Sequence, residues 1–216
     1  LHQRLKQRYP DVPLCIMGHS MGSFLTRTYL IRYPGTVKAA VIMGTGWQPQ
    51  AAITGGLALA NAIAAVSGEN ATSELVTELA FGSYNKLFAP NRTKVDWLSA
   101  DESNVDDYIA DPLCGADATV GLFRQMLHGI RFNQRQSHLR QMDREMPVLF
   151  VAGDKDPVGN CGKGVRQTYD AFRAAGMRDC TLKLYPGLRH EILNEKAYTA
   201  DITKNIEAWL LSRLEK

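Results

Sequence analysis

Ser20 lies in the motif GHSMG (residues 18–22), which has the form G-x-S-x-G. An apolar run precedes it at Pro13–Gly18, and helix-compatible spacing follows it over Met21–Arg32. This context predicts a sharp strand-to-helix turn that exposes the serine hydroxyl at a helix N-terminus, where developing negative charge is stabilised. The two glycines let the strained backbone fit and the helix pack closely. Ser20 is therefore the candidate nucleophile, and His19 beside it is predicted to pack or to form a hydrogen bond within the turn.

A serine nucleophile needs a general base, and a carboxylate must orient that base. With this motif the chain order is serine, then acid, then histidine. Of the five histidines, only His190 follows a candidate strand, so we expect it to be the base. The acid should follow the preceding strand, where GDKDP (residues 153–157) offers Asp156 and Asp154. We favour Asp156, because its position leaves room for the loop to turn inward and Pro157 would stiffen that turn.

The elements that must position these residues are buried strands alternating with helices. Three apolar runs predict strands, at Pro13–Gly18, Val37–Met43 and Pro147–Ala152, and a fourth strand is predicted at Thr181–Tyr185. Three amphipathic stretches predict helices, at Met21–Arg32, Gly164–Ala175 and Ala197–Leu214. This alternation is typical of an α/β fold with a mostly parallel sheet and helices on both faces.

The interval between the second and third strands has a different character, being helical and alanine-rich at first and then polar. We interpret it as an inserted helical lobe. The expected organisation is therefore a core at residues 1–46, an insertion at 47–142 and the rest of the core at 143–216. Within the insertion, Ile53–Val66 suits a helix that lines an apolar pocket or one that packs on a neighbouring helix.

Composition excludes several classes of function. The chain has 216 residues, 45% of them hydrophobic and 22% charged, as in an ordinary globular protein. A net charge of +3, without basic runs interleaved with aromatics, gives no sign of a nucleic-acid partner. Ile53–Val66 is too short and too interrupted to span a bilayer, although transient contact with lipid stays open.

Neither the cysteines nor the predicted chemistry indicates a bound metal or organic cofactor. The chain has four cysteines, which form no C-x-x-C pair and so suggest neither a zinc site nor a redox motif: Cys15, Cys114, Cys161 and Cys180. Cys15 is expected in the core, since it lies in an apolar run. We expect no metal and no organic cofactor. Without a recognisable signal peptide, the default location is the cytoplasm.

The chain resembles the α/β-hydrolase subgroup that contains monoacylglycerol lipases, lysophospholipases and serine aminopeptidase-like hydrolases. Four motifs carry this resemblance: GHSMGS at 18–23, GDKDPVG at 153–159, YPGLRHEILNE at 185–195 and VDWLSADESNVDDYIADPLCG at 95–115. It extends over nearly the whole chain.

The resemblance implies a role for each matching residue. Ser20 would be the nucleophile, Asp156 the acid and His190 the base, and the backbone N–H of Met21 would be one oxyanion donor. It also implies a helical cap at about 47–142 over an acyl-chain pocket. Family members carry several strands before this serine motif, and a His-Gly loop there supplies a second oxyanion donor. We therefore expect either a fragment of a longer enzyme, which we favour, or a second chain that completes the sheet.

Three functions follow from these features. The first is hydrolysis of a carboxylic ester, with a monoacylglycerol or lysophospholipid as the small-molecule substrate. The second is an aminopeptidase-like activity of the same fold, which would need an acidic group in the insertion to hold the substrate amine. Five acidic residues cluster there, and they either serve this purpose or form a solvated charged face: Asp101, Glu102, Asp106, Asp107 and Asp111. The third is a truncated, non-catalytic binding module. Glu191 is either a hydrogen-bonding neighbour of the base or a surface charge.

Overall fold

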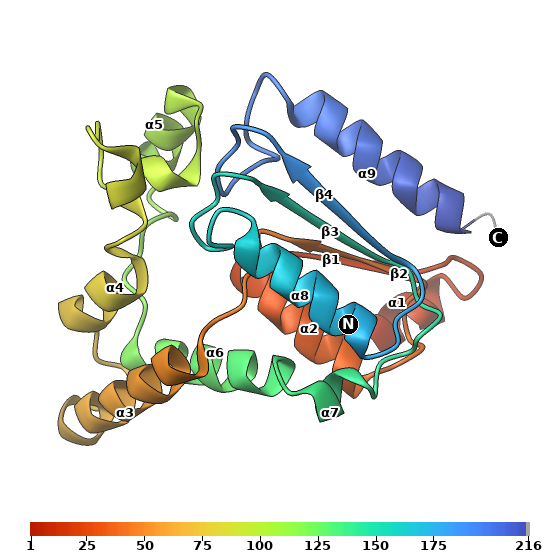
Figure 1. Cartoon of the computed structure of the whole chain (residues 1–216), viewed down its shortest axis with the longest axis horizontal. Coiled ribbons are helices and arrows are strands. Elements are labelled where there is room, and N and C mark those ends of the chain that lie inside the picture. The colour runs from red at the N-terminus through yellow and green to blue at the C-terminus, as the bar shows by residue number, and fades with distance from the viewer. Residues whose placement is uncertain (215–216) are drawn as a thin grey trace.

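The computed structural model describes residues 1–214 and contains a four-stranded, fully parallel sheet with strand order β1-β2-β3-β4. The strands are β1 (Cys15–His19), β2 (Ala39–Met43), β3 (Val148–Gly153) and β4 (Cys180–Tyr185). Their register places Gly18, Ile42, Phe150 and Leu182 in one row across the sheet. The predicted parallel sheet is therefore confirmed, and all four carboxyl ends meet at one edge (Figure 1).

Helices cover both faces of the sheet, as predicted. On one face lie α2 (Met21–Arg32) and α8 (Lys163–Ala174), and on the other lies α9 (Thr199–Leu214) (Figure 1). Alternate residues of β2 enter two separate cores: Ile42 packs on the α2 and α8 side, and Val41 on the α9 side. A strand buried on both faces must be apolar throughout, which explains the continuous apolar runs of β2 and β3. A short helix, α1 (His2–Arg8), precedes β1 and was not predicted.

Between β2 and β3 the chain forms a group of helices and two 3₁₀ turns. These are α3 (Gln50–Ser67), α4 (Glu74–Phe81), η1 (Asn85–Phe88), η2 (Asp96–Leu98), α5 (Glu102–Ala110), α6 (Val120–Asn133) and α7 (Gln136–Leu139). In Figure 1 the helices α3 to α5 lie beyond the carboxyl ends of the strands. Asn133 fixes α6 to α2, because its amide donates to the Phe24 carbonyl at 2.8 Å and accepts from the Thr28 hydroxyl at 2.8 Å.

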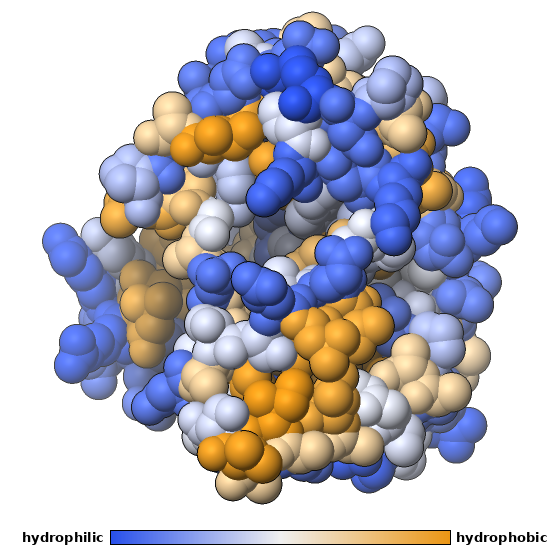
Figure 2. Space-filling model, turned by 90° about the vertical axis from the view of Figure 1, so that its left-hand side faces the viewer, coloured by the Kyte–Doolittle hydropathy of each residue, from blue (hydrophilic) through white to orange (hydrophobic). Residues whose placement is uncertain are grey.

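Helix α3 is longer than the sequence predicted. It runs from Gln50 to Ser67, and among the helices of residues 1–214 it alone is long and apolar enough to cross a membrane by length and composition. Ile53 and Leu57 pack against α6 and α2, but most of the helix faces outward. Figure 2 shows the side of the molecule that carries α3, with an apolar area in its lower part.

The edge strand β1 departs from the prediction of a strand buried on both faces. Cys15 and Met17 are exposed, Met17 by 55%, whereas Gly18 is buried on the α2 side. The expectation that Cys15 is a core residue was therefore wrong. The physical reason is that β1 has one neighbouring strand only, and the α9-side core contains residues of β2, β3 and β4 but none of β1.

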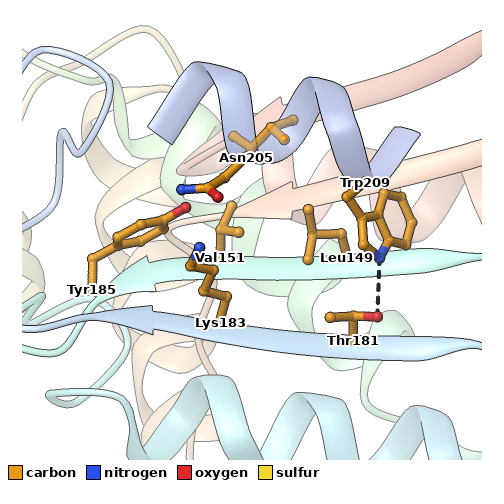
Figure 3. Close-up of a pocket in the computed structure, with 8 residues that line it drawn as sticks. Leu149, Val151, Thr181, Lys183, Tyr185, Asn205 and Trp209 are labelled. Atoms are coloured by element: carbon orange, nitrogen blue, oxygen red, sulfur yellow. Dashed lines mark hydrogen bonds between the residues drawn. The ribbon is translucent and has the colours of Figure 1, made fainter. Parts of the chain in front are cut away.

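Helix α9 is anchored across β3 and β4. The indole N–H of Trp209 donates to the Thr181 hydroxyl at 3.0 Å, and Leu149 and Val151 lie below the helix (Figure 3). A crevice of about 160 Å³ remains between helix and strands. The Tyr185 hydroxyl is buried there, on the side of the crevice that Asn205 also lines (Figure 3).

Candidate active site

Ser20 sits on a strained turn between β1 and α2. Its backbone has φ 54° and ψ −121°, a left-handed region that non-glycine residues rarely adopt, and it caps the N-terminus of α2. The turn is held by a hydrogen bond from the Ser20 N–H to the Met43 carbonyl, at 3.1 Å, and by one from the Ser23 hydroxyl to the Ser20 carbonyl, at 2.6 Å. The predicted strand, sharp turn and helix are thus in place.

The two glycines of the motif are not equivalent. A Cβ atom at Gly18 would lie 2.2 Å from the Gly22 carbonyl oxygen and 2.3 Å from the Thr26 hydroxyl, so β1 and α2 could not approach as they do. A Cβ atom at Gly22 would meet nothing within 4 Å. Close packing therefore requires glycine at position 18 only, a refinement of the sequence-based expectation.

Asp156 and His190 form a closely paired, buried unit. The Asp156 carboxylate accepts a hydrogen bond from Nδ1 of His190 at 3.0 Å, and the exposed fractions of the two side chains are 0% and 3%. The second Asp156 oxygen accepts from the Val158 N–H at 2.9 Å. Asp154 instead accepts from the Gly187 N–H at 2.8 Å, and so caps the turn that leads to His190. The geometry brings Asp156 to the imidazole and leaves Asp154 in the loop.

His19 contacts the backbone of the candidate base. Its Nε2 lies 3.0 Å from the His190 carbonyl oxygen, and the two imidazole rings are 4.6 Å apart between centroids. Burial lowers the pKa of His19, and the nearby His190 lowers it further. His19 is therefore neutral at neutral pH, and as the tautomer that carries a proton on Nε2 it donates to that carbonyl. His19 thus forms a hydrogen bond, but its partner lies in the His190 loop and not in the serine turn for which the bond was predicted.

Gly44 lies close to both imidazoles. Its φ is +57°, and a Cβ atom there would lie 3.1 Å from the His19 ring and 3.1 Å from Cε1 of His190. Because Ser20 donates to the carbonyl of Met43, the residue just before Gly44, the serine turn and the base meet at the end of β2. Within residues 1–214 no hydrogen bond joins the Ser20 hydroxyl to His190. Such contacts are commonly loose before substrate binds and tighten in the reacting complex.

Met21, the predicted oxyanion donor, is the first residue of α2. The first N–H groups of a helix have no partner within it and point toward the space above its N-terminus. That space is next to the Ser20 hydroxyl, because Ser20 is the preceding residue. The position of Met21 is therefore compatible with donation to an oxyanion.

Aromatic side chains from the helical insertion approach His190, a feature that sequence reasoning missed. The Trp97 ring lies 5.2 Å from the His190 ring, Tyr84 packs edge-on against Trp97 at 5.2 Å, and Phe81 stacks on Trp97 at 6.3 Å. Burial, aided by the charge of Asp156, raises the pKa of Tyr84 to about 12. The only early signal was that Trp97 falls inside the matching stretch at 95–115. Figure 2 views this side and shows a hollow in the middle of the face.

Arg27 is a second feature that the sequence did not reveal. It lies on α2, is fully buried, and donates through Nη1 to the Gly46 carbonyl at 3.0 Å and to the Thr45 hydroxyl at 3.3 Å. Its burial lowers the pKa to about 9. A Cβ atom at Gly46 would lie 2.3 Å from the Val158 carbonyl, so the loop that Arg27 holds packs directly on the loop of Asp156.

A family model and two curated relatives show which proteins this chain is similar to. A family model described as serine aminopeptidase, S33, matches residues 1–197. The chain is 31% identical over 211 residues to a monoacylglycerol lipase of Mycolicibacterium smegmatis, covering 95% of this chain and 65% of that protein. It is 26% identical over 217 residues to a monoglyceride lipase of Mus musculus, covering 97% of this chain and 62% of that protein. The chain thus spans less than two thirds of the length of these relatives.

Solved structures show the same fold. A thermostable carboxyl esterase from Bacillus coagulans superposes with a TM-score of 0.90 at 24% identity, over 98% of this chain and 68% of that one. A monoacylglycerol lipase from Paleococcus ferrophilus gives a TM-score of 0.70 at 18% identity, over 98% of this chain and 74% of that one. The matched family model shows the family, and these likenesses show the fold. The chain belongs to the serine aminopeptidase S33 family and has an α/β-hydrolase fold.

Proposed function

We propose that this chain carries the catalytic residues of a serine hydrolase that cleaves carboxylic esters of the monoacylglycerol or lysophospholipid type. The observation that carries the proposal is the convergence at one sheet edge of a strained Ser20 turn and a buried Asp156–His190 pair. The lipase and esterase names of the relatives support an ester substrate. The helices at residues 47–142 would form the cap over the acyl chain, with cores at 1–46 and 143–216.

The mechanism follows from these positions. Ser20 attacks the ester carbonyl carbon while His190 accepts the hydroxyl proton, and the carbonyl oxygen becomes an oxyanion next to the Met21 N–H. Asp156 fixes the imidazole with Nδ1 protonated and stabilises the imidazolium that forms. His190 then returns the proton to the leaving alcohol. Water, activated in the same way, hydrolyses the acyl-enzyme.

The aminopeptidase-like alternative needs a free carboxylate to hold a substrate amine, and the acidic group of the insertion is otherwise engaged. Asp106 pairs with Arg92 at 2.6 Å, and Asp107 pairs with Lys196 at 3.3 Å. Asp101 accepts from the N–H and the hydroxyl of Ser103. Asp111 likewise accepts from a backbone N–H within its own turn. These contacts favour capping and surface pairing, and they leave ester hydrolysis as the better supported reaction.

The test is hydrolysis of a panel of substrates by the purified chain. The panel comprises p-nitrophenyl esters of rising acyl length, a monoacylglycerol, a lysophosphatidylcholine and an amino-acid p-nitroanilide, with Ser20→Ala as the control. We expect ester turnover that is lost in the control, and preference for a glyceride or a lysophospholipid would identify the substrate class. Preference for the anilide would support the peptidase. Absence of any turnover by a folded chain would support the non-catalytic binding module.

We also propose a cytoplasmic location. All four cysteines, which lie within the described part of the chain, are free thiols, as is usual in a reducing compartment. Counting reactive thiols in the native protein, isolated under alkylating conditions, tests this. Four free thiols are expected, and a disulfide between any two of them would argue for an oxidising compartment.

A further inference from the structure

Two segments far apart in sequence meet beside His190. The first, residues 189–196, contains the candidate base and follows β4. The second, which we call the 96–107 segment, comprises η2 and part of α5 and belongs to the helical insertion. Hydrogen bonds of both backbone and side chains join them over almost their whole length.

The 96–107 segment holds the main chain of His190 from both sides. Before the base, the Arg189 guanidinium donates to the carbonyl of Ser99 at 3.0 Å and also to that of Asp96. After the base, the Glu191 N–H donates to the Leu98 carbonyl at 2.8 Å. The Glu191 carboxylate also accepts from the Asn104 amide at 3.0 Å.

A buried carboxylate completes this junction. Glu195 is only 3% exposed, and its two oxygens accept from successive backbone N–H groups, Ala100 at 2.8 Å and Asp101 at 3.1 Å. A buried carboxylate is costly unless it is well hydrogen-bonded, so this one fixes the place where the two segments touch. Lys196 adds an exposed contact to Asp107 at 3.3 Å.

The ring of the base is held by the same segment. The Trp97 ring packs against the imidazole, with 5.2 Å between the ring centroids. Trp97 belongs to the same segment whose backbone carbonyls accept hydrogen bonds from Arg189 and Glu191. From the sheet side the loop is fixed by the Lys155 N–H, which donates to the Leu188 carbonyl at 2.9 Å. The imidazole therefore depends on two supports, the sheet and the insertion.

We propose that the 96–107 segment positions the general base, with Glu195 and Arg189 as the positioning residues that join it to the His190 loop. This rests on the proposed function. The acidic stretch of the insertion is then a scaffold for catalysis and takes no part in binding a substrate amine. Displacement of this segment would move His190 out of place, so hydrolysis requires the 96–107 segment to stay in contact with the His190 loop.

The experiment compares Glu195→Gln with Glu207→Gln, a change at an exposed position on α9. Glutamine keeps the size of glutamate but offers one acceptor oxygen in place of two, so one of the two N–H groups loses its partner. We expect kcat and the rate of fluorophosphonate labelling of Ser20 to fall about ten- to a hundred-fold in Glu195→Gln, with KM little changed. Glu207→Gln should match the wild-type protein.

A spectroscopic readout separates positioning from simple loss of structure. The Nδ1 proton that His190 shares with Asp156 should give a far-downfield proton NMR signal in the wild-type protein and in Glu207→Gln. In folded Glu195→Gln this signal should shift or broaden. Unchanged kcat and an unchanged signal in Glu195→Gln would overturn the inference, as would a loss of activity matched by a fall in the folded fraction while the signal stays intact.

Two further comparisons keep the inference testable. If Glu195→Gln does not fold, Arg189→Met replaces it, since methionine keeps an unbranched side chain but has no donor for the two carbonyls that Nη1 of Arg189 contacts. The same fall in kcat and the same change in the NMR signal are expected, and wild-type values for both would overturn the inference. If the wild-type protein shows the downfield signal but hydrolyses no ester, the proposed function fails, and the signal in the variants still decides the positioning role.

Discussion

The carboxylate of Asp156 accepts a hydrogen bond from Nδ1 of His190 at 3.0 Å, and neither side chain is open to solvent. Because an ionised carboxylate can only accept, this contact fixes the imidazole tautomer with its proton on Nδ1 and leaves Nε2 able to take a proton. The pair alone does not make a nucleophile. The proposed active site also needs Ser20, which lies at the same edge of the sheet.

The two candidate acids should differ sharply when each is replaced. Asp156→Asn should lower kcat about 10⁴-fold, because the amide can donate to Nδ1 and would stabilise the wrong tautomer. Asp154→Asn should leave kcat nearly unchanged, because that side chain only accepts from the Gly187 N–H, a contact that contributes about 1 kcal/mol or less to folding. Steady-state ester hydrolysis by the two variants checks this, and a larger loss in Asp154→Asn would reverse the assignment.

The glycines of the serine motif form a matched pair of tests. Gly18→Ala should abolish stable folding or raise the yield of insoluble protein, since its Cβ would overlap the Gly22 carbonyl. Gly22→Ala should be tolerated, and it could raise the free energy of unfolding by about 0.5–1 kcal/mol, because alanine is favoured over glycine inside a helix. Urea denaturation of both variants measures the difference. Equal destabilisation by the two substitutions would contradict the described packing.

Gly44→Ala should affect catalysis more than folding. A left-handed backbone costs an alanine about 1–2 kcal/mol, and the new methyl group would press on the rings of both His19 and His190. We expect a folded protein whose ester hydrolysis is strongly reduced. The measurement is activity per correctly folded molecule alongside the thermal midpoint. Full activity would show that Gly44 does not limit the position of the base.

The pH dependence of stability should report on His19. Its pKa lies below the ordinary value of 6.5 in the folded protein, chiefly because it is buried, so the unfolded chain binds the proton at a higher pH. The contribution of His19 to the free energy of unfolding is therefore fully present above pH 6.5 and declines as the pH falls below it. His190, Asp156 and Glu191 are the titratable neighbours that act on this pKa.

His19→Gln removes this titration while retaining an N–H donor for the His190 carbonyl. The difference in the free energy of unfolding between the wild-type protein and the variant should be constant above pH 6.5 and should shrink toward about pH 5. Urea denaturation across this range measures it. A difference that stays constant over the whole range would show that the His19 pKa is unshifted.

The sequence predicted the sheet and the serine turn well because their signals are local. Apolar runs marked three of the four strands, and the motif marked the turn at Ser20. The neighbours of His190 come from a segment far away in the sequence. Nothing in the spacing of Trp97, Glu195 or His190 predicts that the 96–107 segment lies beside the His190 loop. The buried Arg27 was missed for a related reason. A charged side chain is expected to be exposed, but Thr45 and Gly46 supply acceptors that allow Arg27 to be buried. On the same helix the apolar Leu25 is exposed.

The exposed edge of β1 shows how neighbours decide burial. An apolar run that ends in a serine turn predicts a strand, but burial of Cys15 and Met17 would need a helix or a further strand beside them, and the described residues provide neither. The sequence alone also left Asp154 as an alternative to Asp156, since both follow the glycine that ends β3. Only the contact with His190 distinguishes them.

The most direct test of the account is covalent labelling of the purified chain with a fluorophosphonate, with the modified residue located by mass spectrometry. We predict a single label on Ser20, lost in Ser20→Ala and greatly slowed in His190→Ala, with both variants folded as judged by their thermal midpoints. A folded wild-type chain that takes no label, or that is labelled at another residue, would contradict the assignment of Ser20 and His190 as nucleophile and base.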